Sequence, residues 1–246
     1  MKKIYQSFLV ALGLCLLLSG FSTPAGASDV KSIEVKREDA VYDESLGAYI
    51  IPFIKVDGEL VQLNQEEFDE LNEQTLTIEE AEALMEEAEQ LPGAMEGDDI
   101  SPFDNYREWY TYTENTNYNV TGSTTYKVSA ELDCTNLTRC DITKLNAATI
   151  SATYSVGLVA EKDAIKANAG FSWTESATSS TSYRFQLVKG EKGYVGFTPY
   201  LRLSNGALHK YSNWDGLISS RAVYAYSPKT TSTGEADGIY KLVFTR

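Results

Sequence analysis

The side chains that usually carry enzyme or metal chemistry are scarce in this chain. It contains one histidine, His209, and three cysteines, Cys15, Cys134 and Cys140. One histidine supplies no cluster for zinc or iron, and three cysteines are too few for a four-thiolate site. A Ser-His-Asp hydrolase would depend on His209 alone, and the sequence has no G-x-S-x-G motif. We therefore expect no catalytic residue, no metal and no cofactor, and we predict that the protein is not an enzyme.

The first 27 residues have the pattern of a signal peptide. Two lysines precede an apolar run from Phe8 to Leu18, and Ala25-Gly26-Ala27 forms an A-x-A cleavage site before Ser28. The run is shorter than the roughly 20 residues that a membrane-spanning helix needs. We predict cleavage between Ala27 and Ser28 and export of a soluble, extracellular protein.

Removal of a signal peptide leaves two cysteines, Cys134 and Cys140. In an oxidising compartment, two cysteines so close in sequence most simply form a disulfide with each other. Their spacing is not that of a C-x-x-C redox motif, which favours a structural bond over a redox-active one.

Acidic residues are concentrated in the first third of the chain. The whole chain has a formal net charge of −14; residues 28–100 contain 22 acidic and 4 basic side chains, whereas residues 101–246 contain 13 and 15. Such an acidic protein repels phosphate groups, so we expect no nucleic-acid partner. The composition changes around Pro92-Gly93, which indicates four parts. They are a signal peptide (1–27), an acidic module or pro-region (28–92), a linker (93–103) and a β domain (104–246).

The acidic region has the signals of a hairpin and two helices. Asp57-Gly58 separates two apolar segments, which is typical of a β-hairpin turn. Asn64 and Thr77 each stand three residues before a glutamate, as in capping boxes. The glutamates lack the spacing of a calcium loop, so a solvated acidic face is favoured over a calcium site. A pro-region that masks or assists the next domain is the other interpretation.

The second region alternates apolar and polar residues with a period of two, as in Tyr183, Phe185 and Leu187, and turn signals separate the segments. It also holds all three tryptophans. We therefore predict a mainly β protein, an antiparallel elongated sheet or sandwich with a small acidic α+β module at its N-terminus.

The longest alternating pattern lies between Thr149 and Ser176. It predicts two strands of about 11 residues, roughly 35 Å long, which is the length of a tilted transmembrane β-strand. One face is apolar and the other carries serine, threonine, asparagine and glycine, as lipid-facing and lumen-facing sides of a β-pore require. A half-buried hairpin of a β-sandwich would show the same alternation. The candidate membrane-facing residues are Ile150, Ala152, Tyr154, Val156, Leu158, Ile165, Ala167, Ala169, Phe171 and Trp173.

The segment Gly170-Phe171-Ser172-Trp173-Thr174-Glu175-Ser176 runs through a Ser/Thr tract into Tyr183-Arg184-Phe185-Gln186-Leu187-Val188. This pattern resembles the middle of aerolysin-type β-pore-forming proteins, over roughly residues 118–203. The resemblance implies an elongated β fold, oligomerisation of identical copies and a membrane target. The acidic N-terminal region matches no feature of that family, and no large receptor-binding lobe is evident.

The competing hypothesis is a secreted module that binds carbohydrate or protein at a cell surface without acting on a membrane. Exposed aromatic rings often form such platforms. The candidate rings are Trp109, Tyr194, Tyr200, Tyr211, Trp214, Tyr224 and Tyr226. Most of them would instead be core residues of a sandwich, and both interpretations remain open at this stage.

Overall fold

The computed structural model describes residues 30–33, 35–88 and 105–245. The predicted signal peptide with its Ala27–Ser28 cleavage site, and the predicted linker at 93–103, lie outside these residues. The chain divides into two units, Met1–Val30 and Lys31–Arg246, and every element described below belongs to the second. Its described residues are mainly β, with antiparallel-rich sheets and three α-helices, so the predicted fold class is confirmed.

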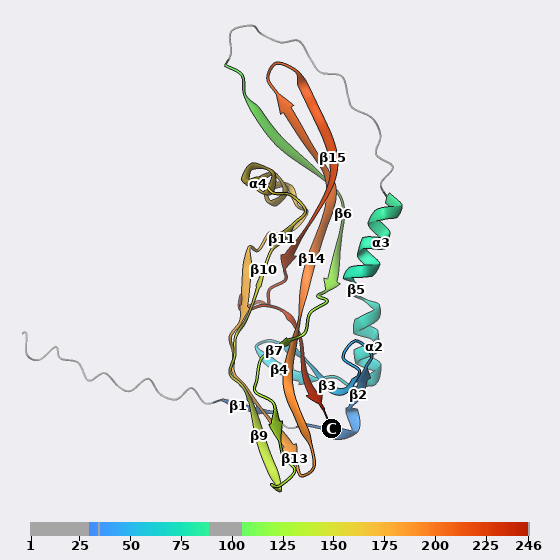
Figure 1. Cartoon of the computed structure of the whole chain (residues 1–246), viewed down its shortest axis with the longest axis vertical. Coiled ribbons are helices and arrows are strands. Elements are labelled where there is room, and N and C mark those ends of the chain that lie inside the picture. Colours follow the sequence, from blue (N-terminus) through green and yellow to red (C-terminus); the bar gives the residue numbers. More distant parts are fainter. Residues whose placement is uncertain (1–29, 34, 89–104, 246) are drawn as a thin grey trace, which may run out of the picture. The chain divides into compact units, whose positions relative to one another are not determined.

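Strand β14 (Lys192–Ser212) is the organising element of the largest sheet (Figure 1). At ~3.3 Å per residue it extends about 70 Å, which lets different strands pair with its two halves. Its first half pairs with β16 (Gly238–Phe244) on one edge and with two short strands, β7 (Tyr126–Lys127) and β8 (Leu132–Asp133), on the other. Its second half lies between β6 (Glu108–Thr121) and β15 (Gly216–Pro228).

The first half of β14 belongs to the largest hydrophobic core. Facing it is a three-stranded sheet of β1 (Lys31–Ile33), β13 (Tyr183–Val188) and β9 (Arg139–Lys144). The alternation in β13 turns Tyr183, Phe185 and Leu187 inward, as the sequence predicts, and all three are fully buried. We call this cluster the main core; its members include Ile51, Phe53, Val195, Phe197, Tyr240 and Leu242.

The predicted disulfide is confirmed at the edge of the main core. Cys134 and Cys140 are bonded, with 5.8 Å between their Cα atoms, and both side chains are buried. Closing so short a loop stabilises the fold by about 2 kcal/mol. The bond therefore favours a structural role for Cys134 and Cys140.

The acidic region contains the elements predicted from its turn and capping signals. Asp57-Gly58 forms the turn of the β3–β4 hairpin, and Asn64 accepts a hydrogen bond from the Glu67 backbone N–H. The elements are a 3-10 turn (Arg37–Asp39), β2 (Val41–Asp43), β3 (Ala48–Val56), β4 (Glu59–Gln62), α2 (Gln65–Glu73), β5 (Leu76–Thr77) and α3 (Ile78–Ala88).

One correction concerns how separate this region is. Strand β3 pairs with the C-terminal strand β16, with Phe53 opposite Tyr240, and Phe53 belongs to the main core. β5 pairs with the end of β6. The change in charge near Pro92 therefore does not mark a break in the sheet, because pairing between distant segments leaves no trace in composition.

A second correction concerns the predicted hairpin between Thr149 and Ser176. The structure has short strands at β10 (Ala148–Ser151), β11 (Thr153–Tyr154) and β12 (Ser176–Ser179), with helix α4 at Val159–Asn168. The two-strand prediction is therefore wrong for this conformation. Ala, Glu and Lys residues favour the helix, and Glu161, Ala164 and Ile165, spaced for one helix face, are buried. Ile165 fits both the period of two that predicted a strand and the helical period of α4.

Candidate functional site

Residues 152–175, which we call the insert, leave and rejoin the sheet at one point. β10 and β12 pair antiparallel, with Ile150 opposite Ala177 and Ser151 opposite Ser176. The Ala152 N–H then donates to the Glu175 carbonyl over 2.8 Å. The two ends of the insert are thus already joined as the base of a hairpin.

The insert packs against the second half of β14 and its neighbours β6 and β15 (Figure 1). Ile165 of α4 is fully buried there, and Val156 and Ala164 are nearly so. The sheet contributes Tyr112, Leu208, Val223 and Ala225 to this second cluster, with Tyr110, Tyr154 and Trp173 at its border. The rings of Tyr154 and Trp173 are stacked, with centroids 5.4 Å apart.

Strand pairing and polar side-chain contacts tie the insert to the sheet. Strand β11, within the insert, pairs with β15, and the Ser155 N–H donates to the Tyr224 carbonyl at 2.9 Å. The buried Glu161 side chain pairs with Arg221 of β15 at 2.7 Å, and the Gly170 N–H donates to Glu114 of β6 at 2.9 Å. Nearer the base, the Thr174 N–H donates to the Ser227 hydroxyl at 2.8 Å. These contacts, with the apolar cluster, hold α4 in place.

The candidate membrane-facing residues are divided by this arrangement. Ile150, Val156 and Ile165 are buried, whereas Leu158 is 57% exposed and Ala167 is exposed. The remaining members (Ala152, Tyr154, Ala169, Phe171 and Trp173) are half-buried, and Phe171 and Trp173 stack on each other at 5.7 Å. They do not form one continuous apolar face in this conformation.

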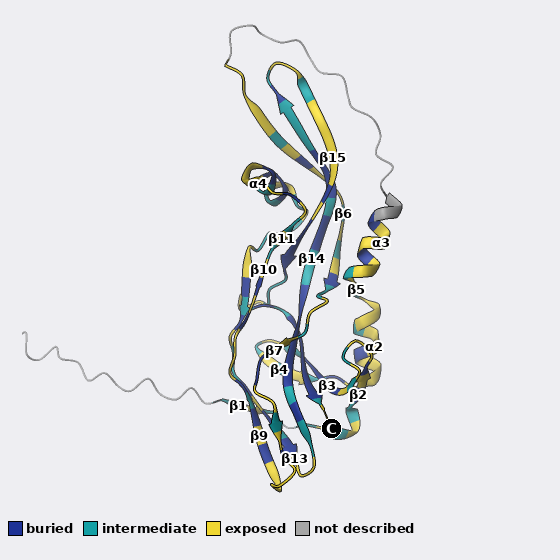
Figure 2. Ribbon diagram, viewed as in Figure 1, coloured by how far each residue is buried: buried dark blue, intermediate teal, exposed yellow. Residues whose placement is uncertain are grey.

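Aromatic side chains gather where β14 turns into β15 and β6 begins. The rings of Trp109 and Tyr211 are stacked at 5.8 Å, and Tyr106 meets Trp214 edge-on at 5.5 Å. We call these four residues the aromatic end. Tyr106, Trp109 and Trp214 are each more than two-fifths exposed, and Figure 2 shows exposed residues along this part of β6 and β15.

Charged groups at the aromatic end are paired. Glu108 accepts a hydrogen bond from the Tyr106 hydroxyl at 2.7 Å and lies 2.8 Å from the Lys210 ammonium. The hydrogen bonds from Lys210 and then Tyr106 lower the pKa of Glu108, and the bond to Glu108 raises the pKa of Tyr106. Lys210, held by Glu108, also has a raised pKa. The carboxylate and ammonium therefore stay charged at neutral pH.

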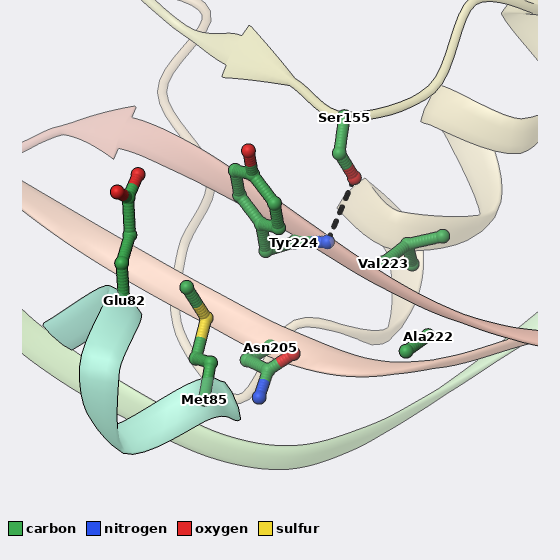
Figure 3. A pocket seen from close by; sticks show the side chains of 7 residues that line it. All are labelled: Glu82, Met85, Ser155, Asn205, Ala222, Val223 and Tyr224. Carbon is green, nitrogen blue, oxygen red and sulfur yellow. Dashed lines mark hydrogen bonds between the residues drawn. The ribbon is translucent and has the colours of Figure 1, made fainter. Parts of the chain in front are cut away.

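The other rings proposed as a binding platform lie elsewhere. Tyr200 and Tyr226 are buried, and Tyr194 receives the Lys127 ammonium over its ring at 4.4 Å. Tyr224 lines a groove of about 360 Å³ between α3 and β15 (Figure 3). Its backbone N–H donates to the Ser155 hydroxyl at 2.8 Å. The groove is lined by Glu82, Met85, Ser155, Asn205, Ala222, Val223 and Tyr224.

The groove offers little for catalysis, because its lining has one carboxylate and neither histidine nor lysine. Among the described residues, no three His, Cys, Asp or Glu side chains come together as metal ligands. In the same part of the chain, no helix combines the length and the apolar character needed to cross a bilayer. The insert and the aromatic end are accordingly the two features to which we assign a function.

The sequence did not lead us to three features of this region. Helix α4 was missed although its Ala, Glu and Lys content was a signal for it. The register between β10 and β12, and the meeting of Trp109 with Tyr211, depend on pairing between distant strands.

No curated protein and no solved structure that was searched matches the chain. A family model, described as a family of unknown function (DUF6060), matches residues 105–246. Because this match covers more than half of the sequence, the chain belongs to the DUF6060 family.

Proposed function

We propose that the protein is exported and acts without catalysis, by inserting residues 152–175 into a membrane as an amphipathic β-hairpin. Several copies would then form a pore, as in the aerolysin-type proteins that the middle of the chain resembles. Export is supported by the signal-peptide pattern of residues 1–27. Insertion is supported above all by one observation, the register in which β10 and β12 pair.

This register specifies the partners of every residue in the insert if the pairing continues past Ser151 and Ser176. Apolar residues would meet apolar residues, and polar or small residues would mostly meet their like. The apolar pairs are Tyr154 with Trp173, Val156 with Phe171, Leu158 with Ala169, and Ala160 with Ala167. The other face has Thr153 with Thr174, Ser155 with Ser172, Gly157 with Gly170, Val159 with Asn168, and Glu161 with Lys166.

A shift of one residue would destroy this match. Tyr154 would then lie opposite Ser172, because side chains alternate between the two faces of a strand. The register also puts the turn at Asp163 and Ala164, next to the charged residues of the insert. Two pairs mix an apolar with a charged side chain: Ala152 with Glu175 near the base, and Lys162 with Ile165 beside the turn.

Conversion of helix α4 into an extended hairpin has an energetic basis. Helix α4 is shorter than the 12–15 residues that make an isolated helix even marginally stable, so contacts with the sheet maintain it. Each arm of the hairpin would have about 12 residues and extend ~40 Å. A tilted strand needs about 9–11 residues to span the membrane, so the arms would be long enough. Because every backbone group in lipid must be paired, several hairpins have to close a barrel.

Open strand edges support association of identical copies. Within the described residues, the outer edge of β6 pairs with β5 only at Val120 and Thr121, and that of β15 pairs with β11 only at Ala225 and Tyr226. An unpaired edge is a template for another strand. A second copy of this chain is the partner that we propose for these edges.

Two adjacent exposed residues give a sharp test. Leu158 is 57% and Val159 is 74% exposed, so aspartate at either position is compatible with the present fold and with the start of α4. In the extended hairpin, Leu158 would face lipid and Val159 the lumen. We therefore expect Leu158→Asp to reduce dye release from vesicles at least tenfold, and Val159→Asp to leave it within about twofold, since a charged side chain on the lipid face destabilises a membrane β-barrel.

Equal leakage by the two variants would contradict the hairpin. Wild-type protein that releases dye from no lipid composition would contradict membrane action altogether. The second candidate, a module that binds carbohydrate or protein at a cell surface, is favoured by the exposed rings of the aromatic end. Retention on polysaccharide without any vesicle leakage would support that candidate instead.

A further inference from the structure

We infer that the aromatic end is the surface by which the protein first docks on a membrane, and that its partner is the interface of a zwitterionic phospholipid bilayer. The inference rests on the proposed membrane function and names the contact that precedes insertion. The four rings of Tyr106, Trp109, Tyr211 and Trp214 come from two distant segments of the chain and lie in two ring pairs. Tryptophan and tyrosine favour the headgroup region, because an apolar ring and a polar group sit in one side chain.

The aromatic end is held in a defined shape by hydrogen bonds. The Arg107 N–H donates to the Asn213 side chain at 2.8 Å, and the Asn213 side chain donates back to the Asn105 carbonyl at 3.0 Å. In the β14–β15 turn, the Ser212 hydroxyl donates to Asp215 and accepts from two backbone N–H groups. Exposed rings on an ordered backbone lose little conformational entropy on binding.

The charges argue for a zwitterionic partner. Among the described residues, the acidic side chains and the lysine and arginine side chains around the four rings are Arg107, Glu108, Lys210 and Asp215, two acids and two bases, and Glu108 and Lys210 pair with each other. The His209 ring lies 6.3 Å from that of Tyr211. Anionic lipid or an acidic glycan would select an excess of basic residues. The described residues of the aromatic end have no excess of basic side chains. Burial of the rings among the headgroups would therefore provide the binding energy.

The aromatic end also lies next to the insert. Trp109 and Tyr211 face each other across β6 and β14, and their neighbours Tyr110 and Lys210 are the next pair in register. Tyr110 points to the other side of the sheet, where it packs with Ile165 and Leu208 in the cluster that holds α4. Docking through the rings would therefore bring the insert close to the bilayer before it unfolds.

The test uses the full chain and vesicles of phosphatidylcholine. We expect the double variant Trp109→Ala, Trp214→Ala to bind these vesicles at least tenfold more weakly in a flotation assay. The matched control is Tyr42→Ala, Tyr49→Ala, which removes another exposed ring pair at 5.4 Å, and it should bind as wild type does. Unchanged binding of the tryptophan variant, or equal losses in both variants, overturns the inference.

A fluorescence measurement remains decisive even if the double variant fails to fold. In Trp109→Phe, Trp173→Phe, the only tryptophan is Trp214. Its emission should shift to shorter wavelength when phosphatidylcholine vesicles are added, and an unchanged spectrum with bound protein overturns the inference.

Leu158→Asp separates the two proposals, because this variant should still dock on vesicles while it releases little dye. If wild type leaks but Trp214 stays in water, only the docking surface is wrong; if wild type neither binds nor leaks, the proposed function fails as well.

Discussion

The two halves of strand β14 are held in very different ways. Between Lys192 and Pro199 the strand has partners on both edges, and its residues belong to a fully buried core that includes Phe53 and Phe185. Between Leu201 and Ser212 its neighbours are β6 and β15, whose outer edges are mostly unpaired within the described residues.

The difference also appears in how the Ser/Thr tract before Tyr183 and the insert are attached to the rest of the fold. At Ser179 and Thr181 the backbone carbonyls accept hydrogen bonds from the buried Lys144 ammonium at 2.7 and 2.8 Å, and Glu235 accepts from the Thr181 backbone and hydroxyl. The insert before this tract packs in a smaller apolar cluster than the main core. The proposed function requires the second part of the sheet to release the insert while the main core stays packed.

The largest expected effect is in the main core. Phe53 is fully buried, and its ring lies 5.1 Å from that of Phe185. Phe53→Ala should lower the free energy of unfolding by about 3–5 kcal/mol, because it removes ring contacts and leaves a cavity. Urea denaturation followed by tryptophan fluorescence measures this change, and a loss below 1 kcal/mol would contradict the assignment of the core.

An intermediate effect comes from the charge at Lys144. Burial, and then the nearby Lys55 charge, lower the pKa of Lys144 to about 8. Between about pH 8 and 10 the unfolded chain holds this proton more strongly, so the free energy of unfolding should rise with pH in that window. Because buried tyrosines with raised pKa values oppose this trend at higher pH, the comparison is best made at pH 8 and 9.5.

Lys144→Met supplies the control for that pH dependence. Methionine removes the titrating group while keeping an unbranched side chain, so the stability difference between pH 8 and 9.5 should shrink. Denaturation curves of both proteins at the two pH values test this. An identical slope in wild type and variant would show that another group is responsible.

The smallest effect on global stability is expected in the insert. Ile165 is as fully buried as Phe53. Ile165→Ala should nevertheless cost less than about 1 kcal/mol of global stability, because α4 can detach without unfolding the main core. Hydrogen exchange should show lost protection in residues 159–168 with little change in β13 and β16. A loss as large as that for Phe53→Ala would mean that the two regions unfold together.

Local signals predicted local structure well. The Asp57-Gly58 turn and the Asn64 capping box needed only neighbouring residues, and both are present. The pairing of β3 with β16 joins residues almost 200 positions apart, which a single sequence does not reveal. In the candidate site, the alternation of apolar residues was real, but it did not distinguish a strand from helix α4, because Ile165 fits both the strand face and the buried helix face. The β10–β12 register specifies which residues of the alternating pattern would face each other in a hairpin. Only the structure shows this register.

The central claim is that the insert changes from a helix to a paired hairpin, and disulfide trapping tests it most directly. Ala160 and Ala167 are both exposed on α4, seven residues apart, which puts their Cα atoms about 10 Å apart, too far for a disulfide. In the extended hairpin they would lie directly opposite each other. Ala160→Cys, Ala167→Cys should therefore form a disulfide only after vesicles are added.

The matched control is Ala160→Cys, Asp163→Cys, whose positions are neighbours on a helix but about 10 Å apart along a strand. It should form its disulfide in solution and lose the ability to do so on vesicles. Formation of the 160–167 disulfide on leaking vesicles, together with loss of the 160–163 disulfide, is the predicted result. Vesicles that leak while only the 160–163 pair forms would contradict the conversion of α4 into a hairpin.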